Sequence, residues 1–152
     1  MIPMEVYLLM AKKILLSIFL GMIIGYDMQI KQKITGMKSN IMICLGSTLF
    51  TIVSIHIPGM NDSARVIAQI VPGIGFLGAG TIFINKKSMV SGITTASTIW
   101  VVAALGIFIG LGYIIIPTMT TLIIISVLNF IPSRKYTKET KSRSKDKKTF
   151  LV

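Results

Sequence analysis

Acidic side chains are scarce in this sequence, which has five Asp and Glu residues against sixteen Lys and Arg. It has one cysteine, Cys44, so an internal disulfide and a cluster of thiolate metal ligands are both excluded. The one histidine, His56, cannot form a zinc site alone, because such sites use three or four protein ligands. A nucleophilic enzyme needs a base beside its hydroxyl or thiol, and the apolar stretches that carry these groups contain no carboxylate nearby. We therefore predict no metal, no cofactor and no enzymatic activity.

Long stretches without charge are what the sequence has in abundance. Apolar residues make up 53% of the chain, the mean hydropathy is +0.79 and the net charge is +11. Such a chain fits two classes of partner, a membrane or a nucleic acid. Nucleic-acid binders spread basic residues over a soluble face or arm, whereas here they cluster in short loops and in one tail. The distribution predicts a membrane protein and excludes a nucleic acid as partner.

The lengths of the apolar stretches predict the fold. A helix that crosses the hydrocarbon core of a bilayer needs about 20 mostly apolar residues. The sequence predicts five such helices, near residues 5–26, 39–57, 64–85, 90–109 and 113–131. Lys12 and Lys13 interrupt the first helix, and their long side chains can reach back to the membrane surface. The predicted fold is all-α, a polytopic bundle of five transmembrane helices.

The positive loops predict the orientation of the bundle. Lys31, Lys33 and Lys38 follow the first helix, Lys86 and Lys87 follow the third, and eight Lys and Arg residues follow the fifth. In a chain of five spans these segments lie on the same side, and positive loops stay in the cytoplasm. We expect a multi-pass protein of the bacterial inner membrane with its N terminus outside and its C terminus cytoplasmic.

The composition changes at the end of the fifth helix, so we divide the chain into two parts. Residues 1–132 are the predicted transmembrane domain, and residues 133–152 form a basic cytoplasmic tail. Low apolar content and many like charges predict that the tail is disordered. Its expected partners are the anionic headgroups of the bilayer, and a dedicated macromolecular contact is the alternative.

Residues 72–80 read PGIGFLGAG, and GIGFLG matches the dinucleotide-binding fingerprint G-x-G-x-x-G. That fingerprint needs a strand before it and an acidic residue about 20 positions later. After Asp62 the next acidic residue is Glu139, and the motif lies inside a predicted span. Nucleotide binding is therefore rejected for this motif.

Helix geometry gives these glycines another purpose. At about 100° per residue, Gly73 and Gly80 share one side of the third helix, and Gly75 and Gly78 share the opposite side. Small residues at such spacing let membrane helices pack closely, which predicts that the third helix lies at the centre of the bundle. Pro72 can bend the helix, so packing alone and packing combined with a binding site both stay open.

Polar or small residues form stripes on three of the predicted helices. Asn40 begins the stripe on the second helix, Arg65 and Gln69 begin the stripe on the third, and Thr94 and Thr95 belong to the fourth. Polar stripes turn inward in a bilayer, since exposure to lipid is costly. They predict either interhelical hydrogen bonds or a small polar cavity or ion path. Gln69 is the strongest candidate for a role beyond packing, because its amide needs several partners.

Two further residues near or within the membrane stand out. Asp27 lies at the inner end of the first helix, four residues before Lys31, which is the favourable order for an ion pair on a helix. Trp100 falls in the middle of the fourth span, where we expect it to anchor packing.

Three blocks of the sequence together resemble the MgtC/SapB family of bacterial inner-membrane proteins. They read GYDMQIKQKITGMKSNIMICLG, DSARVIAQIVPGIGFLGAGTIF and SGITTASTIWVVAALGIFIG, and they occur in this order between Leu15 and Leu128. The resemblance implies a regulatory membrane protein linked to magnesium limitation, to virulence-associated survival inside macrophages and to control of the membrane ATP synthase. The matching positions are Asp27, Gly36, Lys38, Asn40, Arg65, Gln69, Gly73, Gly75, Gly78, Gly80, Gly92, Thr94, Thr95 and Trp100.

The sequence departs from the family pattern in two places. The family has an acid–Arg–acid cluster after the first helix, where this chain has Asp27, Met28 and Gln29. Longer members carry a soluble C-terminal domain, and this chain has the basic tail, so the resemblance is to a short form.

Two functions follow from these patterns. The first is an interaction protein that docks on another membrane complex or on a second copy of itself and thereby regulates ion homeostasis. The second is a cation transporter or channel that uses the polar stripes of helices two to four. Magnesium sites use oxygen ligands, often carboxylates, and predicted helices two to five contain no carboxylate, which favours the first function.

Overall fold

The computed structural model describes residues 3–56, 63–84 and 90–131. The described residues form five helices and one short hairpin. The elements are α1 (Met4–Ile30), α2 (Met37–His56), α3 (Ser63–Gly80), β1 (Phe83–Ile84), β2 (Val90–Ser91), α4 (Ile93–Leu111) and α5 (Ile115–Phe130). The predicted all-α class is confirmed, and the predicted basic tail, residues 133–152, lies outside the described residues.

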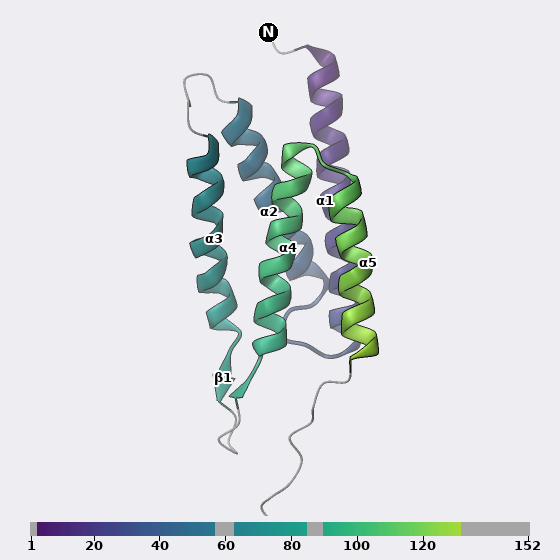
Figure 1. Ribbon diagram of the computed structural model, residues 1–152, viewed down its shortest axis with the longest axis vertical. Coiled ribbons are helices and arrows are strands. Elements are labelled where there is room, and N and C mark those ends of the chain that lie inside the picture. Colours follow the sequence, from purple (N-terminus) through teal and green to yellow (C-terminus); the bar gives the residue numbers. More distant parts are fainter. Residues whose placement is uncertain (1–2, 57–62, 85–89, 132–152) are drawn as a thin grey trace, which may run out of the picture.

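The helices run alternately up and down the bundle (Figure 1). The α1–α2 connection, the β1–β2 hairpin and the end of α5 lie at one end, and the start of α1 and the α4–α5 connection lie at the other. This alternation brings Lys31, Lys33 and Lys38 to one end of the molecule, as the orientation argument requires. Which side of the membrane this end faces stays a prediction.

The third helix ends earlier than predicted, at Gly80 rather than near residue 85. Its last turn tightens, because Thr81 and Ile82 donate their backbone N–H groups to carbonyls three residues back. The β-branched and aromatic residues that follow favour extended backbone, and Phe83 pairs with Ser91 in an antiparallel hairpin. Gly92 closes the hairpin with φ +94°, a conformation that L side chains rarely adopt.

The centre of the bundle is α2, and the prediction that the glycine-rich third helix lies there is wrong. α2 packs extensively against α1 and α4, whereas α3 lies at the edge and packs against α2 and α4 (Figure 1). α5 packs against α1 and α4 on the far side. The small residues that permit the closest helix approach are therefore not those of α3.

The first close approach is between α1 and α2. Gly21 and Gly25 are both buried on α1. A Cβ on Gly25 would lie 2.6 Å from Met37 Cα, and one on Gly21 would lie 3.0 Å from Ile41 Cα. The separation at Gly25 leaves no room for a side chain, and at Gly21 a Cβ would require α2 to move by a few tenths of an ångström, so both glycines favour this close approach of α1.

The second close approach is between α4 and α2. Gly106 and Gly110 are buried on α4. A Cβ on Gly106 would meet the carbonyl oxygen of Cys44, and one on Gly110 would lie 2.5 Å from Thr51 Cβ. Both glycine pairs have the spacing Gly-x-x-x-Gly, and both lie close to Cys44 of α2.

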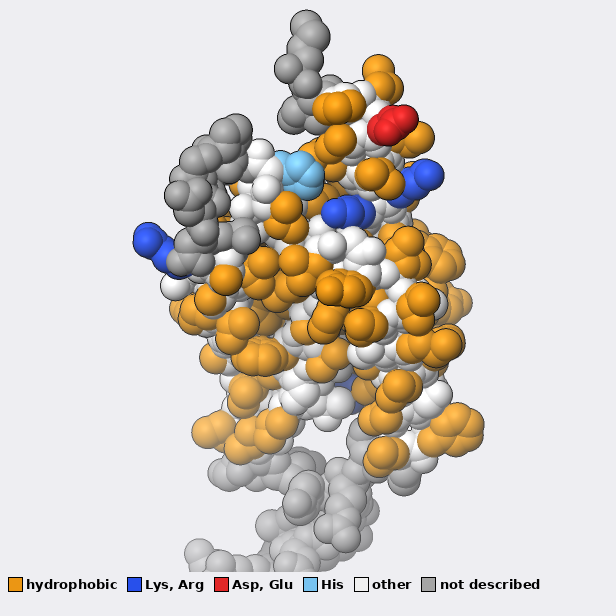
Figure 2. Space-filling model, turned by 45° about the horizontal axis from the view of Figure 1, so that its top comes forward, with side chains coloured by type: hydrophobic (Ala, Val, Ile, Leu, Met, Phe, Trp, Pro, Cys, Tyr) orange, Lys and Arg blue, Asp and Glu red, His pale blue; other side chains and the backbone are white. Residues whose placement is uncertain are grey.

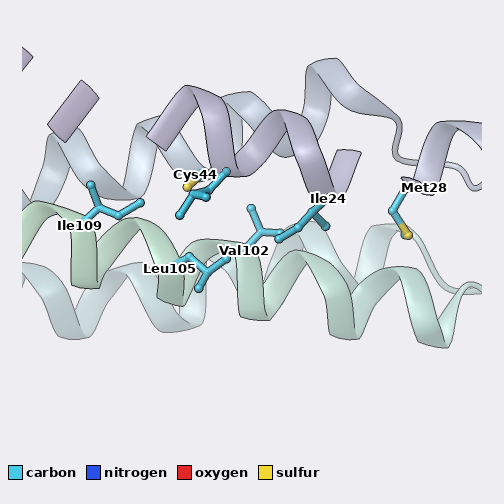
Figure 3. Packing of buried hydrophobic residues seen from close by; sticks show 7 residues of the cluster. Ile24, Met28, Cys44, Val102, Leu105 and Ile109 are labelled. Atoms are coloured by element: carbon cyan, nitrogen blue, oxygen red, sulfur yellow. The ribbon is translucent and has the colours of Figure 1, made fainter. Parts of the chain in front are cut away.

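Apolar side chains fill the space around these approaches. Figure 3 shows the core cluster, in which side chains of α1 and α4 meet at α2. The labelled members are Ile24, Met28, Cys44, Val102, Leu105 and Ile109, all at most 2% exposed. Cys44 is buried as a small apolar residue, as predicted from the sequence.

Many large apolar side chains are exposed on the outer surface, and they cover much of the face shown in Figure 2. Three helices, α1, α2 and α4, are long and apolar enough to cross a membrane. α3 and α5 are shorter apolar helices, and the 16 residues of α5 span about 24 Å. The chain is therefore a membrane protein, and the crossing of α3 and α5 stays a prediction.

Candidate functional site

The predicted polar residues do not come together in one site. Asp27, Asn40, Thr94 and Thr95 lie toward the end of the bundle that carries the hairpin, and Arg65 and Gln69 lie toward the opposite end (Figure 1). Asn40 and Thr95 are buried, whereas Arg65, Gln69 and Thr94 are exposed at the surface of the single chain. Each therefore has to be considered in its own surroundings.

The hydroxyls of the polar stripes serve mainly their own helices. Thr51 donates to the Ser47 carbonyl at 2.8 Å, and Thr98 donates to the Thr94 carbonyl at 2.8 Å. Thr48 differs, because its Oγ1 lies 3.0 Å from the carbonyl oxygen of Gly106 on α4. The stripe of α2 therefore faces the glycines of α4 and supports helix packing, one of the two predicted roles.

Asn40 is fully buried where α1 crosses α2. Its Cβ lies 3.1 Å from the position of a Cβ on Gly25, and its Nδ2 donates to the Gly36 carbonyl at 2.9 Å. Its Oδ1 has no hydrogen-bond partner among the described residues. The side chain thus hydrogen-bonds the start of α2 where this helix packs against α1, and its buried Oδ1 remains an acceptor without a donor among the described residues.

Asp27 belongs to a polar cluster that joins α1 to α5. Its carboxylate accepts from Lys31 Nζ at 2.7 Å, which confirms the predicted ion pair. Lys31 also donates to the Leu128 carbonyl at 2.9 Å, and Asn129 Nδ2 donates to the other Asp27 oxygen at 3.1 Å. Leu128 and Asn129 were not predicted, because the sequence gives no sign that the end of α5 lies beside α1.

The surface of α3 carries two grooves, one on each side. The groove toward α2 has a volume of about 380 Å³ and is lined by Gly73, Gln69, Leu77 and residues of α2. The groove toward α4 has a volume of about 500 Å³ and is lined by Gly75, Gly78 and residues of α4. Gly73 thus lines one groove and Gly75 and Gly78 line the other, whereas Gly80 lines neither.

The glycines of α3 are nevertheless not packed within the chain as the sequence predicted. A Cβ on Gly73, Gly75 or Gly80 would meet nothing within 4 Å among the described residues, and one on Gly78 would lie 3.7 Å from Ala96. Trp100, the predicted packing anchor, is 47% exposed and lines the groove toward α4. The glycines of α3 thus leave an open groove on each of two sides of the helix.

The sequence already contained a signal for the glycines that do pack. GMIIG and GIFIG are the segments that include Gly21, Gly25, Gly106 and Gly110, and each has two glycines four residues apart. This spacing is the usual mark of close packing between membrane helices. The glycines of α3 are more numerous, but none of them lies four residues from another.

The fold and these surfaces define a class, a membrane-helix bundle with a tightly packed centre and one loosely attached edge helix. The chain belongs to the MgtC family, whose sequence pattern matches residues 14–136. It is 39% identical over 111 residues to Protein MgtC of Brucella abortus (strain 2308), covering 73% of this chain and 46% of that protein.

Two other relatives extend the comparison. Protein SapB of Bacillus subtilis (strain 168) is 37% identical over 128 residues, covering 79% of this chain and 55% of that protein. The protein named "Putative magnesium transporter YhiD" of Escherichia coli (strain K12) is 36% identical over 122 residues, covering 73% of this chain and 56% of that protein. The chain thus spans about half the length of these curated relatives, and no solved structure matches it.

Proposed function

We propose that this chain is a regulatory protein of the bacterial inner membrane that acts in magnesium homeostasis by binding another membrane protein complex. The name of the Escherichia coli relative connects the family with magnesium. The family resemblance points to the membrane ATP synthase as one such complex. The regulation requires no chemistry at the chain itself, in keeping with the prediction that it is not an enzyme.

The proposal rests on the two grooves beside α3, which no other described part of the chain fills. Gly73 and Gly75 face two different grooves and meet no neighbour within 4 Å in the described part of the chain. Association of membrane helices depends on small residues that let backbones approach and on polar groups that form hydrogen bonds. Gln69 supplies such an amide at the α2 side, and it is exposed. A transmembrane helix of another protein fits this combination.

A photo-crosslinking amino acid at Leu77 tests this docking surface, because Leu77 lines the groove and is 50% exposed. We expect a crosslink to a larger membrane protein in magnesium-limited cells, and loss of that crosslink in the Gly73→Leu background. The matched control places the same crosslinker at Ile123 on α5, which is 62% exposed. Crosslinks of equal yield from both positions, or a crosslink that survives Gly73→Leu, would count against the proposal.

Cation transport is the second candidate function, and the name of the Escherichia coli relative favours it. A magnesium path needs oxygen ligands, often carboxylates. The carboxylates of the described residues, Glu5 and Asp27, are both on α1, and no three His, Cys, Asp or Glu side chains of these residues could hold a metal ion together. The hydroxyls on the stripes of α2 and α4 donate to helix carbonyls, and a hydroxyl oxygen is a neutral ligand, so these stripes offer a magnesium ion no carboxylate.

The two functions are separated by reconstitution of the purified protein in vesicles that contain a magnesium-sensitive dye. The regulatory function predicts no flux above protein-free vesicles. Flux that disappears in Gln69→Leu but not in Thr118→Val, a hydroxyl change on the outer side of α5, would establish transport instead. Thr118 is suitable as the control because it is exposed and its hydroxyl donates within its own helix, to the Ile114 carbonyl.

A further inference from the structure

A cavity of about 360 Å³ opens at the end of the bundle where α2 ends and α4 turns into α5. Apolar side chains, among them Leu16, Ile109 and Ile114, form most of its wall. Lys12, Lys13 and His56 line it as well. Figure 2 shows this end of the molecule, where blue and pale blue basic side chains lie among apolar ones.

Lys13 is the deepest of these cations. It precedes Asp27, at the other end of α1, by 14 residues, or about 21 Å of helix, whereas the hydrocarbon core of a bilayer is about 30 Å thick. Lys13 is half-buried, and its Nζ donates to the Gly110 carbonyl at 2.7 Å. An ammonium group has three donors, so two remain to be satisfied at a depth where water is scarce.

His56 and Lys12 add further donors around the same space. His56 Nδ1 lies 2.9 Å from the Ile52 carbonyl oxygen, and because that oxygen can only accept, Nδ1 carries a hydrogen in this pair. Nε2 is then the ring atom left for a ligand, and it donates when the imidazole is protonated. Lys12 is exposed at the rim. None of the described residues that line the cavity is acidic, so none of them can neutralise the positive charges of Lys12 and Lys13.

We propose that this cavity binds an anionic membrane phospholipid, with the phosphate beside Lys13, Lys12 and His56 and the hydrocarbon against the apolar wall. Basic pockets between membrane helices bind acidic lipid headgroups through charge-assisted hydrogen bonds. The apolar wall distinguishes this ligand from free phosphate, which has no hydrocarbon to cover Leu9, Leu16 and Ile114. A bound phosphate would also pair with the Lys13 ammonium, and charged side chains within a membrane are stabilised by such pairing.

The proposal is tested with the full chain in detergent by native mass spectrometry, with dioleoyl phosphatidylglycerol and dioleoyl phosphatidylcholine as the probes. We expect wild type to bind phosphatidylglycerol more tightly than phosphatidylcholine. In Lys13→Met the ratio of the two affinities should fall about five-fold, the factor that corresponds to about 1 kcal/mol per lysine at an anionic surface. Lys38→Met is the matched control, because it removes the same charge from an exposed site at the opposite end of the bundle. Lys13→Arg keeps the charge and should keep the preference.

Each other outcome overturns the proposal. Equal preference in wild type and Lys13→Met, or an equal loss in Lys38→Met, would show that no local site exists. Displacement of phosphatidylglycerol by millimolar inorganic phosphate would show a site for a soluble anion instead. If Lys13→Met does not elute as a folded protein, Lys12→Met combined with His56→Phe removes two donor side chains and leaves the bond from Lys13 to Gly110 in place. Retention of the full preference in that double variant would contradict the proposal.

Discussion

Thr48 on α2 places its hydroxyl oxygen 3.0 Å from the carbonyl oxygen of Gly106 on α4. The same hydroxyl lies 2.9 Å from the Cys44 carbonyl oxygen of its own helix, so one hydrogen serves two acceptors. The contact is possible because Gly106 has no side chain to separate the two backbones. Close packing and interhelical hydrogen bonding therefore depend on each other at this crossing.

Replacement of Thr48 by valine tests the bond between the helices. Valine keeps the branched shape and removes the hydroxyl, so we expect the free energy of unfolding to fall by about 0.6–1.7 kcal/mol. Thr118→Val is the matched control, since its hydroxyl bonds within α5 and is exposed, and it should leave stability nearly unchanged. Unfolding by SDS titration measures both variants, and an equal effect in the two would contradict the role of Thr48.

The glycines of α4 and α3 should respond oppositely to the same substitution. Gly106→Ala puts a Cβ against the Cys44 carbonyl and within 2.7 Å of Ser47 Cβ, so we expect a loss of about 1–3 kcal/mol from overpacking. Gly73→Ala fills open space and should stabilise the helix by about 0.5–1 kcal/mol. Thermal unfolding in detergent distinguishes the two, and a destabilised Gly73→Ala variant would mean that α3 is packed after all.

This contrast shows how far the sequence could predict the fold. Long stretches without charge suffice to predict five helices and their alternation, because both depend on local composition. A helical wheel places Gly73 and Gly75 on opposite sides of α3 correctly, yet it cannot say which neighbour approaches each side. Gly106 has a second glycine four residues on, and Gly73 does not. Which neighbour each of them meets still follows only from the three-dimensional arrangement of the helices.

In the polar cluster at the end of α1, local contacts could likewise be predicted from the sequence and distant ones could not. The pair of Asp27 and Lys31 was predictable, because residues four apart on a helix face each other. The contact of Asn129 with Asp27 joins residues 102 positions apart, and no local pattern connects them. Gln69 and Asn40 were identified from the polar stripes of their helices, and the structure places them toward opposite ends of the bundle.

The Asp27 cluster should contribute to stability through its ion pair. The two side chains are 15% and 26% exposed, respectively for Asp27 and Lys31, so solvent screens them only in part. A double-mutant cycle with Asp27→Asn and Lys31→Met should give a coupling of about 0.5–1 kcal/mol that decreases with added salt. Lys38→Met, at an exposed site, replaces Lys31→Met in the control cycle. Equal coupling in both cycles would show a general charge effect rather than this pair.

The orientation of the bundle is open to a direct test with single cysteines in a Cys44→Ala background. Tyr113 is exposed in the connection between α4 and α5, and Lys33 lies in the connection between α1 and α2, at the other end of the bundle. Because positive loops stay in the cytoplasm, Tyr113→Cys should react with a membrane-impermeant maleimide on intact spheroplasts, and Lys33→Cys should react only after permeabilisation. The reverse result would invert the protein in the membrane. Three crossings, by α2, α3 and α4, separate Lys33 from Tyr113, so a five-span topology places these two residues on opposite sides of the membrane. Labelling of both cysteines from outside would show that this topology is wrong.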